Sequence, residues 1–285
     1  MAASGLKGAC PMSLFWTNDH FATDQYADET AVFESYPDQE LQLPASSGEL
    51  KTITVRLADS DDQRNSARML VNRRYAWRGY GDQHQIPAKS SHMTFTASSD
   101  EGVVGTITLG VDSPAGLAAD DIFKDEIDSF RNVPGAKVCE LTKLAFDADV
   151  SSKPMLAALF HIVFIYGYNE HRCTDLFIEV NPRHRRFYQA MLGFKPVGEV
   201  KTNQSVDAPS VLMWLKVDDI RKAIDAHAGH GQESSRSLYP FFFSEKEEQG
   251  IFARLAASTR DTIQAKSAYF AAKANDPASI PDTRS

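Results

Sequence analysis

The stretch FIEVNPRHRRFYQAMLGFKPV, Phe177–Val197, predicts a strand, then a helix, then a second strand. Asn181 and Pro182 suit the start of the helix, because Asn caps free N–H groups and Pro fits the first turn. Gly193 is typical of the residue that ends a helix in a left-handed conformation. The stretch therefore predicts a unit of one strand, one helix and a second strand near the middle of the chain.

The segments on either side continue this alternation of elements. Apolar residues at every second position, bounded by turn residues, indicate strands. The predicted strands are 51–58, a hairpin pair within 92–111, 136–147, 173–180, 194–200 and 210–217. Helices are predicted within 59–80, in the acidic segment before 136, after a Ser151 or Ser152 cap, and at 181–192. The order predicts a mixed α/β domain, with a central sheet flanked by helices.

Three parts of the chain differ in pattern. Residues 1–50 show no sustained period and are interpreted as an N-terminal arm. Residues 51–217 carry the alternating strands and helices and are predicted to form the functional domain. Residues 218–285 are predicted to form a mostly helical C-terminal extension that ends in a tail.

Composition narrows the possible functions. The 285 residues are 42% hydrophobic and carry a net charge of -8, which argues against a general nucleic-acid binder. Cys10, Cys139 and Cys173 are widely spaced, which suggests a reduced cytoplasm and no metal site. The longest apolar run, Met155–Tyr168, is too short and interrupted to span a bilayer, and no signal peptide is evident.

In this order of elements, NPRHRRFYQAMLGFKPVGE resembles the closing segment of GNAT acyltransferases. ELTKLAFD, Glu140–Asp147, is similar to the strand of acyl-homoserine-lactone synthases, in which an acidic residue opens a strand that ends in an apolar pair and Asp. The hairpin, ADDIFKDEIDSFR and NPRHRRFYQAMLGF together look most like the FeeM-like N-acyl amino acid synthases. The resemblance covers roughly Lys51–Val217 and implies a GNAT-like fold and N-acyl transfer.

The loop before the long apolar helix departs from ordinary acetyltransferases. That loop reads DADVSSKP and lacks the glycines that bring backbone N–H groups close to a pyrophosphate. Ser151, Ser152, Lys153 and the helix N-terminus would instead meet a single phosphopantetheine phosphate. This favours a thioester on acyl carrier protein over coenzyme A as acyl donor, in agreement with the resemblance.

Three side chains are candidates for proton transfer. Glu140 interrupts an apolar strand, so its carboxylate faces a polar cavity or is paired, with Lys143 or Arg172 as possible partners. The resemblance implies that Glu140 prepares the amine and that Tyr188 protonates the departing thiolate. His184 lies four residues before Tyr188, on the same helix face, and is a second candidate base. Structural roles remain the alternative for all three.

Attack of an amine on a thioester also needs a hydrogen-bond donor for the oxyanion. We expect the backbone N–H groups of Leu144, Ala145 and Phe146 to serve the oxyanion and the pantetheine. No metal and no bound cofactor are required, because the acyl-phosphopantetheine thioester is a co-substrate.

The cations of the opening stretch are candidates for docking. Carrier proteins are acidic, so Arg183, Arg185 and Arg186 would attract one to the thioester entrance. The alternative is a solvated helix face paired with carboxylates of this chain.

A second cationic cluster, NRRYAWRGYG, follows the first helix. The resemblance implies that this segment closes over the acceptor, with Arg74 holding an amino-acid carboxylate and Tyr75, Trp77 and Tyr80 lining the pocket. Binding of single-stranded nucleic acid fits poorly with the acidic chain, and a cationic helix end is the plain alternative.

The sequence therefore predicts transfer of a medium or long acyl chain from acyl carrier protein to the α-amine of an amino acid. The apolar helix, the phenylalanines of LYPFFF, Ile251 and Phe252 are possible walls of an acyl tunnel, although any core needs such residues. The alternatives are a coenzyme A-dependent acyltransferase, a homoserine-lactone synthase and a non-catalytic ligand sensor of the same fold.

Overall fold

The computed structural model describes residues 39–44, 50–147, 152–231 and 235–253. These residues form one eight-stranded sheet in the order β1-β2-β3-β4-β5-β6-β8-β7. The strands are β1 (Gln39–Pro44), β2 (Leu50–Leu57), β3 (His92–Ser99), β4 (Gly102–Val111), β5 (Val138–Phe146), β6 (Asp175–Val180), β7 (Lys195–Asn203) and β8 (Ala208–Lys216). The predicted mixed sheet and its strands from β2 onward are confirmed.

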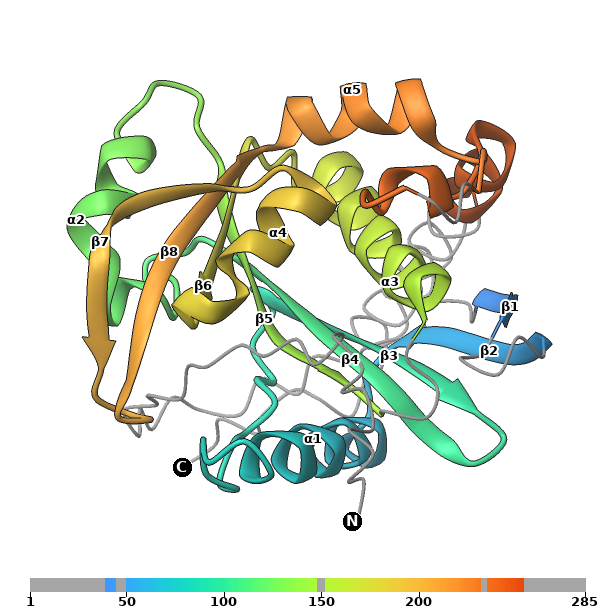
Figure 1. The fold of residues 1–285 in the computed structure, drawn as a ribbon, viewed down its shortest axis with the longest axis horizontal. Coiled ribbons are helices and arrows are strands. Elements are labelled where there is room, and N and C mark those ends of the chain that lie inside the picture. The colour runs from blue at the N-terminus through green and yellow to red at the C-terminus, as the bar shows by residue number, and fades with distance from the viewer. Residues whose placement is uncertain (1–38, 45–49, 148–151, 232–234, 254–285) are drawn as a thin grey trace, which may run out of the picture.

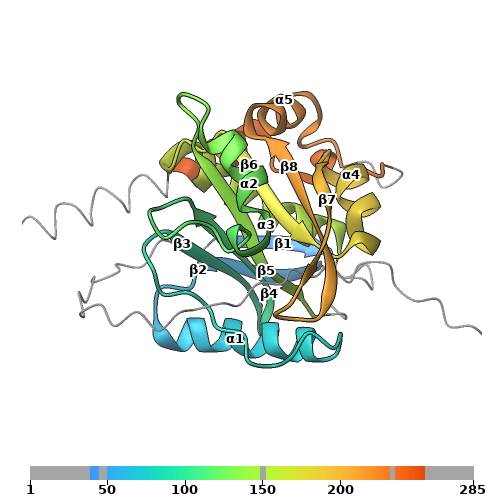
Figure 2. The ribbon, with the colours of Figure 1, turned by 90° about the vertical axis from the view of Figure 1, so that its left-hand side faces the viewer.

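Helices cover both faces of this sheet. The α-helices are α1 (Asp61–Ala76), α2 (Asp120–Arg131), α3 (Lys153–Ile165), α4 (Arg185–Leu192) and α5 (Val217–His227), and residues 245–253 form the last described helix. In Figures 1 and 2, α1 lies on the side of the sheet opposite α3 and α5. Successive strand residues point to opposite faces, and on β5 Glu140 contacts the N-terminal end of α2 while Leu141 faces α3.

The helix boundaries follow from local chemistry. Ser60 and Gln63 form a capping box at the start of α1, and the Ser152 hydroxyl caps α3 by accepting the N–H of Met155. Asn181 accepts the N–H of Arg183, and Gly193 ends α4 with φ of 85°, as predicted. The predicted helix 181–192 is divided, because Asn181 caps the 3-10 turn η2 (Pro182–His184) and α4 begins only after it.

The sheet changes character between β5 and β6. All other neighbouring strands are antiparallel, whereas β5 and β6 are parallel and pair only from Val138–Glu140 to Asp175–Phe177. Beyond Glu140 the two strands diverge, and no described strand pairs with the β6-facing edge of β5. The backbone along this edge is therefore available to a substrate.

A bulge lies at the same part of β5. Thr106 pairs with Ala145 and Thr108 pairs with Thr142, so β5 carries one residue more than β4 between these pairs. Lys143 adopts a φ of 52°, and its carbonyl accepts a hydrogen bond of 2.7 Å from the Thr106 hydroxyl. An extra residue in one strand changes the direction in which the neighbouring backbone groups point.

Two parts of the chain extend the predicted domain. Gln39–Pro44, within the predicted arm, forms β1 and pairs antiparallel with β2. The segment after α5 packs onto α3 and α4: the Tyr239 hydroxyl donates to the Leu192 carbonyl at 2.9 Å, and the Phe243 N–H donates to His161 Nδ1 at 3.0 Å. Part of the extension therefore belongs to the core.

Candidate functional site

The gap between β5 and β6 is the centre of the candidate site. Glu140 stands where the two strands separate, and the bulge at Lys143 follows it on β5. On one face of the sheet the gap is flanked by Glu140 and Glu179, and on the other by the apolar side chains under α3 and α4. The site thus has a polar face and an apolar face.

Glu140 is buried, with 2% of its surface exposed. Its carboxylate accepts the N–H groups of Ala118 at 2.7 Å and Ala119 at 3.1 Å, at the start of α2. Neither Lys143 nor Arg172 makes this contact, so the pairings suggested by the sequence are not the ones that hold Glu140. Burial raises the pKa of Glu140 to about 7, although the two N–H groups oppose that rise.

Sequence reasoning missed three residues around Glu140. Glu179 is a buried carboxylate on β6 that accepts hydrogen bonds from Asn203 and Ser210 and helps to raise the pKa of Glu140. Gly110 pairs with Glu140, and His92 pairs with Gly110 on the next strand. The hairpin that brings His92 opposite Gly110 was predicted, but nothing in it marked these two residues.

On the apolar face, Tyr188 is completely buried. Its ring packs edge-on against Phe187 and Phe194 from the same helix region, at centroid distances of 5.2 and 6.0 Å. Leu192 of the same helix lines an apolar pocket together with Phe160 of α3, whereas Glu140 binds the start of α2. The two predicted proton-transfer groups therefore lie on opposite sides of the sheet.

The predicted oxyanion strand contributes backbone to the gap. Leu144, Ala145 and Phe146 are buried in β5, directly after the bulge. Ala145 and Phe146 pair with β4 on one edge, while Leu144 falls within the bulge. They lie beside the open edge of β5, and their oxyanion role stays a prediction.

Some of the residues predicted to contact the phosphate already have partners within the chain. The Ser152 hydroxyl caps α3, and Lys153 Nζ donates to the Ser235 carbonyl at 2.8 Å. Lys153 thus also holds the C-terminal segment in place. Ser151 lies outside the described residues.

Two contacts place the end of α1 across the mouth of the gap. Arg73 pairs with Asp147, just after β5, at 2.7 Å. Arg183, just after β6, donates to the Tyr80 hydroxyl, also at 2.7 Å. The segment between Arg73 and Tyr80 therefore connects the two diverging strands at their carboxyl ends, so the predicted acceptor segment and part of the predicted docking group form one entrance.

Cations and aromatic rings share this entrance. The guanidinium of Arg78 lies 4.3 Å from the ring centroid of exposed Trp77, and that of Arg74 lies 5.4 Å from it. Burial, together with Arg183 and Arg74, lowers the pKa of Arg78. A group of like charges in one place suits an anionic ligand. Tyr75, by contrast, is fully buried beneath the entrance and supports it.

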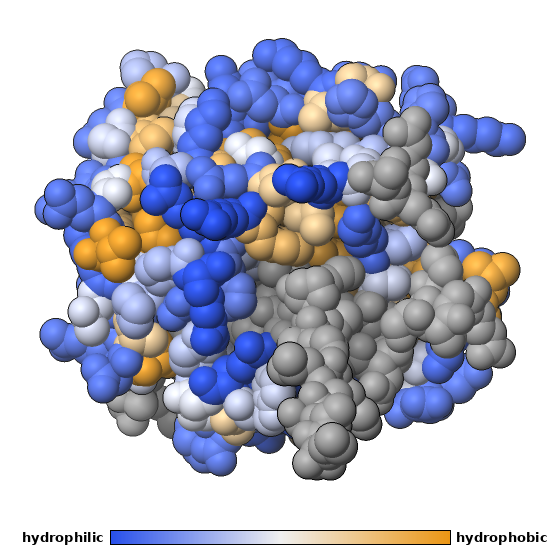
Figure 3. Space-filling view, in the orientation of Figure 1, coloured by the Kyte–Doolittle hydropathy of each residue, from blue (hydrophilic) through white to orange (hydrophobic). Residues whose placement is uncertain are grey.

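His184 belongs to the entrance. Its Nε2 accepts from Arg183 Nε at 3.0 Å, and burial with the nearby Arg183 and Arg78 lowers its pKa to about 4. A group with this pKa is a weak base at neutral pH, which leaves Glu140 as the stronger candidate. Arg185 and Arg186 are exposed on α4, and Figure 3 shows strongly hydrophilic side chains running from the α4 region towards the end of α1.

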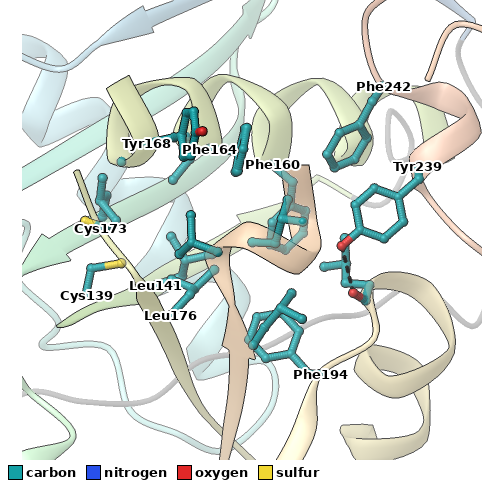
Figure 4. A pocket seen from close by; sticks show the side chains of 17 residues that line it. Cys139, Leu141, Phe160, Phe164, Tyr168, Cys173, Leu176, Phe194, Tyr239 and Phe242 are labelled. Carbon is teal, nitrogen blue, oxygen red and sulfur yellow. Dashed lines mark hydrogen bonds between the residues drawn. The ribbon is translucent and has the colours of Figure 1, made fainter. Parts of the chain in front are cut away.

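An apolar pocket lies on the other face of the gap (Figure 4). Residues of the sheet, α3, α4, α5 and the C-terminal segment line it, among them Leu141, Phe160, Phe194 and Phe242. Cys139 and Cys173 stand together at one side, and the Cys139 thiol donates to the Asp175 carbonyl at 3.6 Å. Both are free thiols, as the sequence suggested.

Two of the residues predicted to line an acyl tunnel lie outside the lining of the apolar pocket. Ile251 is buried in the core, while Phe252 is 37% exposed and lines a separate surface cleft beside Arg221. Within the described ranges, no group of three or more His, Cys, Asp or Glu side chains could hold a metal ion. The described helices include none with the length and hydropathy that a membrane crossing requires.

Comparisons with known proteins relate this arrangement to a family. The family model of the N-acyl amino acid synthase FeeM matches residues 66–216, which is just over half of the chain. The solved structure of FeeM, from uncultured soil microbes, shares 28% identity with a TM-score of 0.56, covering 60% of this chain and 95% of that one.

More distant structures show lower similarity. The acyl-homoserine-lactone synthase LasI is 12% identical with a TM-score of 0.46, covering 59% of this chain and 91% of that one. An N-acetyltransferase from Staphylococcus aureus Mu50 is 12% identical with a TM-score of 0.40, covering 58% and 98%. No curated protein matches the chain. The sheet topology and the family match together establish that this chain is an N-acyltransferase with a GNAT-like fold and belongs to the FeeM family of N-acyl amino acid synthases.

Proposed function

We propose that this enzyme transfers a medium or long acyl chain from an acyl carrier protein thioester to the α-amine of an amino acid. The observation that carries the proposal is the placement of Glu140 and Tyr188 on opposite faces of the sheet at the gap between β5 and β6. The acceptor amine approaches from the Glu140 face and the acyl thioester occupies the other. The α-carbon and side chain of the amino acid remain on the polar side.

The reaction forms one C–N bond and breaks one C–S bond. The amine nitrogen attacks the thioester carbonyl, and the proton it loses passes to the Glu140 carboxylate. The oxyanion is stabilised by backbone N–H groups beside the bulge, where none of the described strands pairs with the β5 edge. The intermediate then expels the pantetheine thiolate, which takes a proton from the Tyr188 hydroxyl. Tyr188 regains a proton from solvent when the carrier thiol leaves.

The acyl chain enters the apolar pocket, whose cavity volume is about 30 Å³, so side chains of the lining must move apart to admit it. The pocket lining is contributed by β5, α3 and the C-terminal segment, so the pocket is complete only when that segment is docked. Aliphatic chains bind such surfaces through burial of apolar area. Residues 218–253 therefore act with the 51–217 region in binding the donor.

The entrance favours two negatively charged ligands. The exposed Arg185 and Arg186 dock the acidic carrier protein, while Arg74 and the neighbouring cations hold the amino-acid carboxylate at the end of α1. The glycine-free start of α3 supports a phosphopantetheine arm as donor in preference to coenzyme A. Neither a metal nor a bound cofactor takes part in these steps.

Mass spectrometry of lipid extracts tests the reaction class. A bacterial host expressing the enzyme should accumulate masses that correspond to acyl chains on one or a few amino acids. A host expressing Glu140→Gln at equal soluble level is the matched control. Absence of new N-acyl amino acids, with folded protein present, would refute the proposal and favour a coenzyme A thioester with another amine, or a sensor.

Charge reversal tests carrier docking. Arg185→Glu/Arg186→Glu should raise the KM for an acyl carrier protein thioester about tenfold and change the KM for the amino acid much less, since exposed charges act mainly on encounter. Arg183→Glu is measured separately, because Arg183 also binds Tyr80. Lys222→Glu/Lys246→Glu, at exposed positions on α5 and the last described helix, controls for net charge. Equal effects on both substrates would exclude the docking role.

A further inference from the structure

A buried base requires a route by which its proton leaves. In the proposed reaction Glu140 gains a proton on one face of the sheet, while Tyr188 loses one on the other. The sheet separates them, so the proton on Glu140 does not pass directly to Tyr188. Glu140 is only 2% exposed and must be deprotonated before the next turnover.

On β4, only a glycine stands between Glu140 and His92. His92, Gly110 and Glu140 are direct neighbours on β3, β4 and β5, so their side-chain positions lie on the same face of the sheet. Gly110 has no side chain. A Cβ atom at residue 110 would lie 3.1 Å from Glu140 Cγ, 3.2 Å from Glu140 Oε1 and 3.5 Å from His92 Nε2.

The other side of His92 faces solvent. Its ring lines a polar surface pocket together with Arg64, Lys89, Ser90 and His171. Its Nδ1 lies 3.0 Å from the Ser91 hydroxyl, so the two ring nitrogens face different partners. His92 thus connects the slot over Gly110 with the surface.

We propose that His92 carries the proton of Glu140 to solvent through the slot over Gly110. This inference rests on the proposed role of Glu140 as the base. Protonated Glu140 gives its proton to His92 Nε2, directly or through one water in the slot. The Nδ1 proton of His92 leaves towards Ser91 and the surface pocket, which restores the carboxylate and a neutral imidazole with its proton on Nε2. Exchange with solvent returns the proton to Nδ1 before the next turnover.

The charges around the two groups make the imidazolium a short-lived state. Burial, together with Lys89 and Lys143, lowers the pKa of His92 to about 4, so His92 is neutral between proton transfers and passes a proton on as soon as it gains one. Glu179 and Asp120 act on Glu140 in the opposite sense, by raising its pKa. A neutral imidazole can accept at one nitrogen and donate at the other.

Chemical rescue tests the relay. The assay measures thiol release from dodecanoyl carrier protein with a pool of the twenty amino acids. His92→Ala should lower kcat about ten- to a hundredfold with little change in the KM of the donor. Added imidazole should restore the rate in proportion to its concentration, because the surface pocket admits it. His92→Gln keeps the size and hydrogen bonding but should stay slow, which separates a relay from a structural role.

A double-mutant cycle tests the slot itself. Gly110→Ala alone should slow the enzyme, because its methyl group stands between Glu140 and His92. In the His92→Ala background, Gly110→Ala should lower kcat little further. A His92→Ala enzyme with unchanged kcat, or a His92→Gln enzyme as fast as the wild type, would overturn the relay while leaving the proposed function intact. If Glu140→Gln is fully active, the role of Glu140 as base fails instead.

Discussion

Glu140→Gln is expected to lower kcat by about 10²–10⁴-fold, the usual contribution of a positioned general base. The carboxylate is the group that accepts the amine proton, and an amide of the same shape cannot. The donor should still bind, because the apolar pocket lies on the other face of the sheet. The measurement is steady-state kinetics with an acyl carrier protein thioester and the amino acid found in the lipid extracts.

The pH dependence gives a second readout of the same variant. With a pKa of about 7, wild-type Glu140 should lose its proton, and kcat should rise, as the pH increases through 7. Glu140→Gln should lack this acidic limb. An unchanged limb in the variant would assign it to another group, such as the substrate amine.

The melting temperature of Glu140→Gln shows whether the variant has misfolded. The folded-state pKa of Glu140 lies above its unfolded value, so ionisation disfavours the native state as the pH rises from about 4.5 to 7. Glu140→Gln removes this cost but turns an NH2 group towards one of the two N–H donors, so only a small net change in Tm is expected at pH 8. A large drop in Tm would mean that the variant reports on folding and not on catalysis.

Glu248→Ala is expected to destabilise the protein by about 3 kcal/mol, because it leaves buried polar groups without their partner. Glu248 Oε2 lies 3.4 Å from Nε2 of the fully buried His161, and Oε1 contacts Arg221 at 2.5 Å. The His161 ring stacks on Phe242 and Phe243, with centroid distances of 4.8 and 5.2 Å. These contacts bind the C-terminal segment to α3.

The same cluster predicts loss of stability in acid. His161 and Arg221 hold the pKa of Glu248 at about 2, although burial opposes this, and its unfolded value is 4.5. The stabilisation is complete above pH 4.5 and is lost as the pH falls towards 2, about 3 kcal/mol in all. Burial also lowers the pKa of His161, which adds to the loss below pH 6.5.

Denaturant unfolding between pH 3 and pH 8 checks this prediction. Glu245→Ala, an exposed change on the same helix, is the control and should behave like the wild type. Glu248→Ala should flatten the acid dependence as well as lower stability at neutral pH. If Glu248→Ala and Glu245→Ala have equal stability, the cluster does not hold the C-terminal segment.

Much of the fold follows from local sequence. Asn181, Pro182 and Gly193 set the ends of the turn and helix in the opening stretch, because capping and left-handed backbone depend on a few neighbouring residues. Alternating apolar residues placed the strands from β2 onward. β1 was not predicted, since a short edge strand is stabilised by pairing with β2 and carries little pattern of its own.

The sequence by itself determined that Glu140 is an unusual carboxylate, because a charged side chain inside an apolar strand needs a partner wherever the strand lies. Tertiary structure alone decided that the partner is the start of α2, that Tyr188 lies across the sheet, and that Arg183 meets Tyr80. It also decided that Gly110 separates His92 from Glu140. These contacts join residues 18 to more than 100 positions apart, and strand register, which no local pattern records, sets which of them meet.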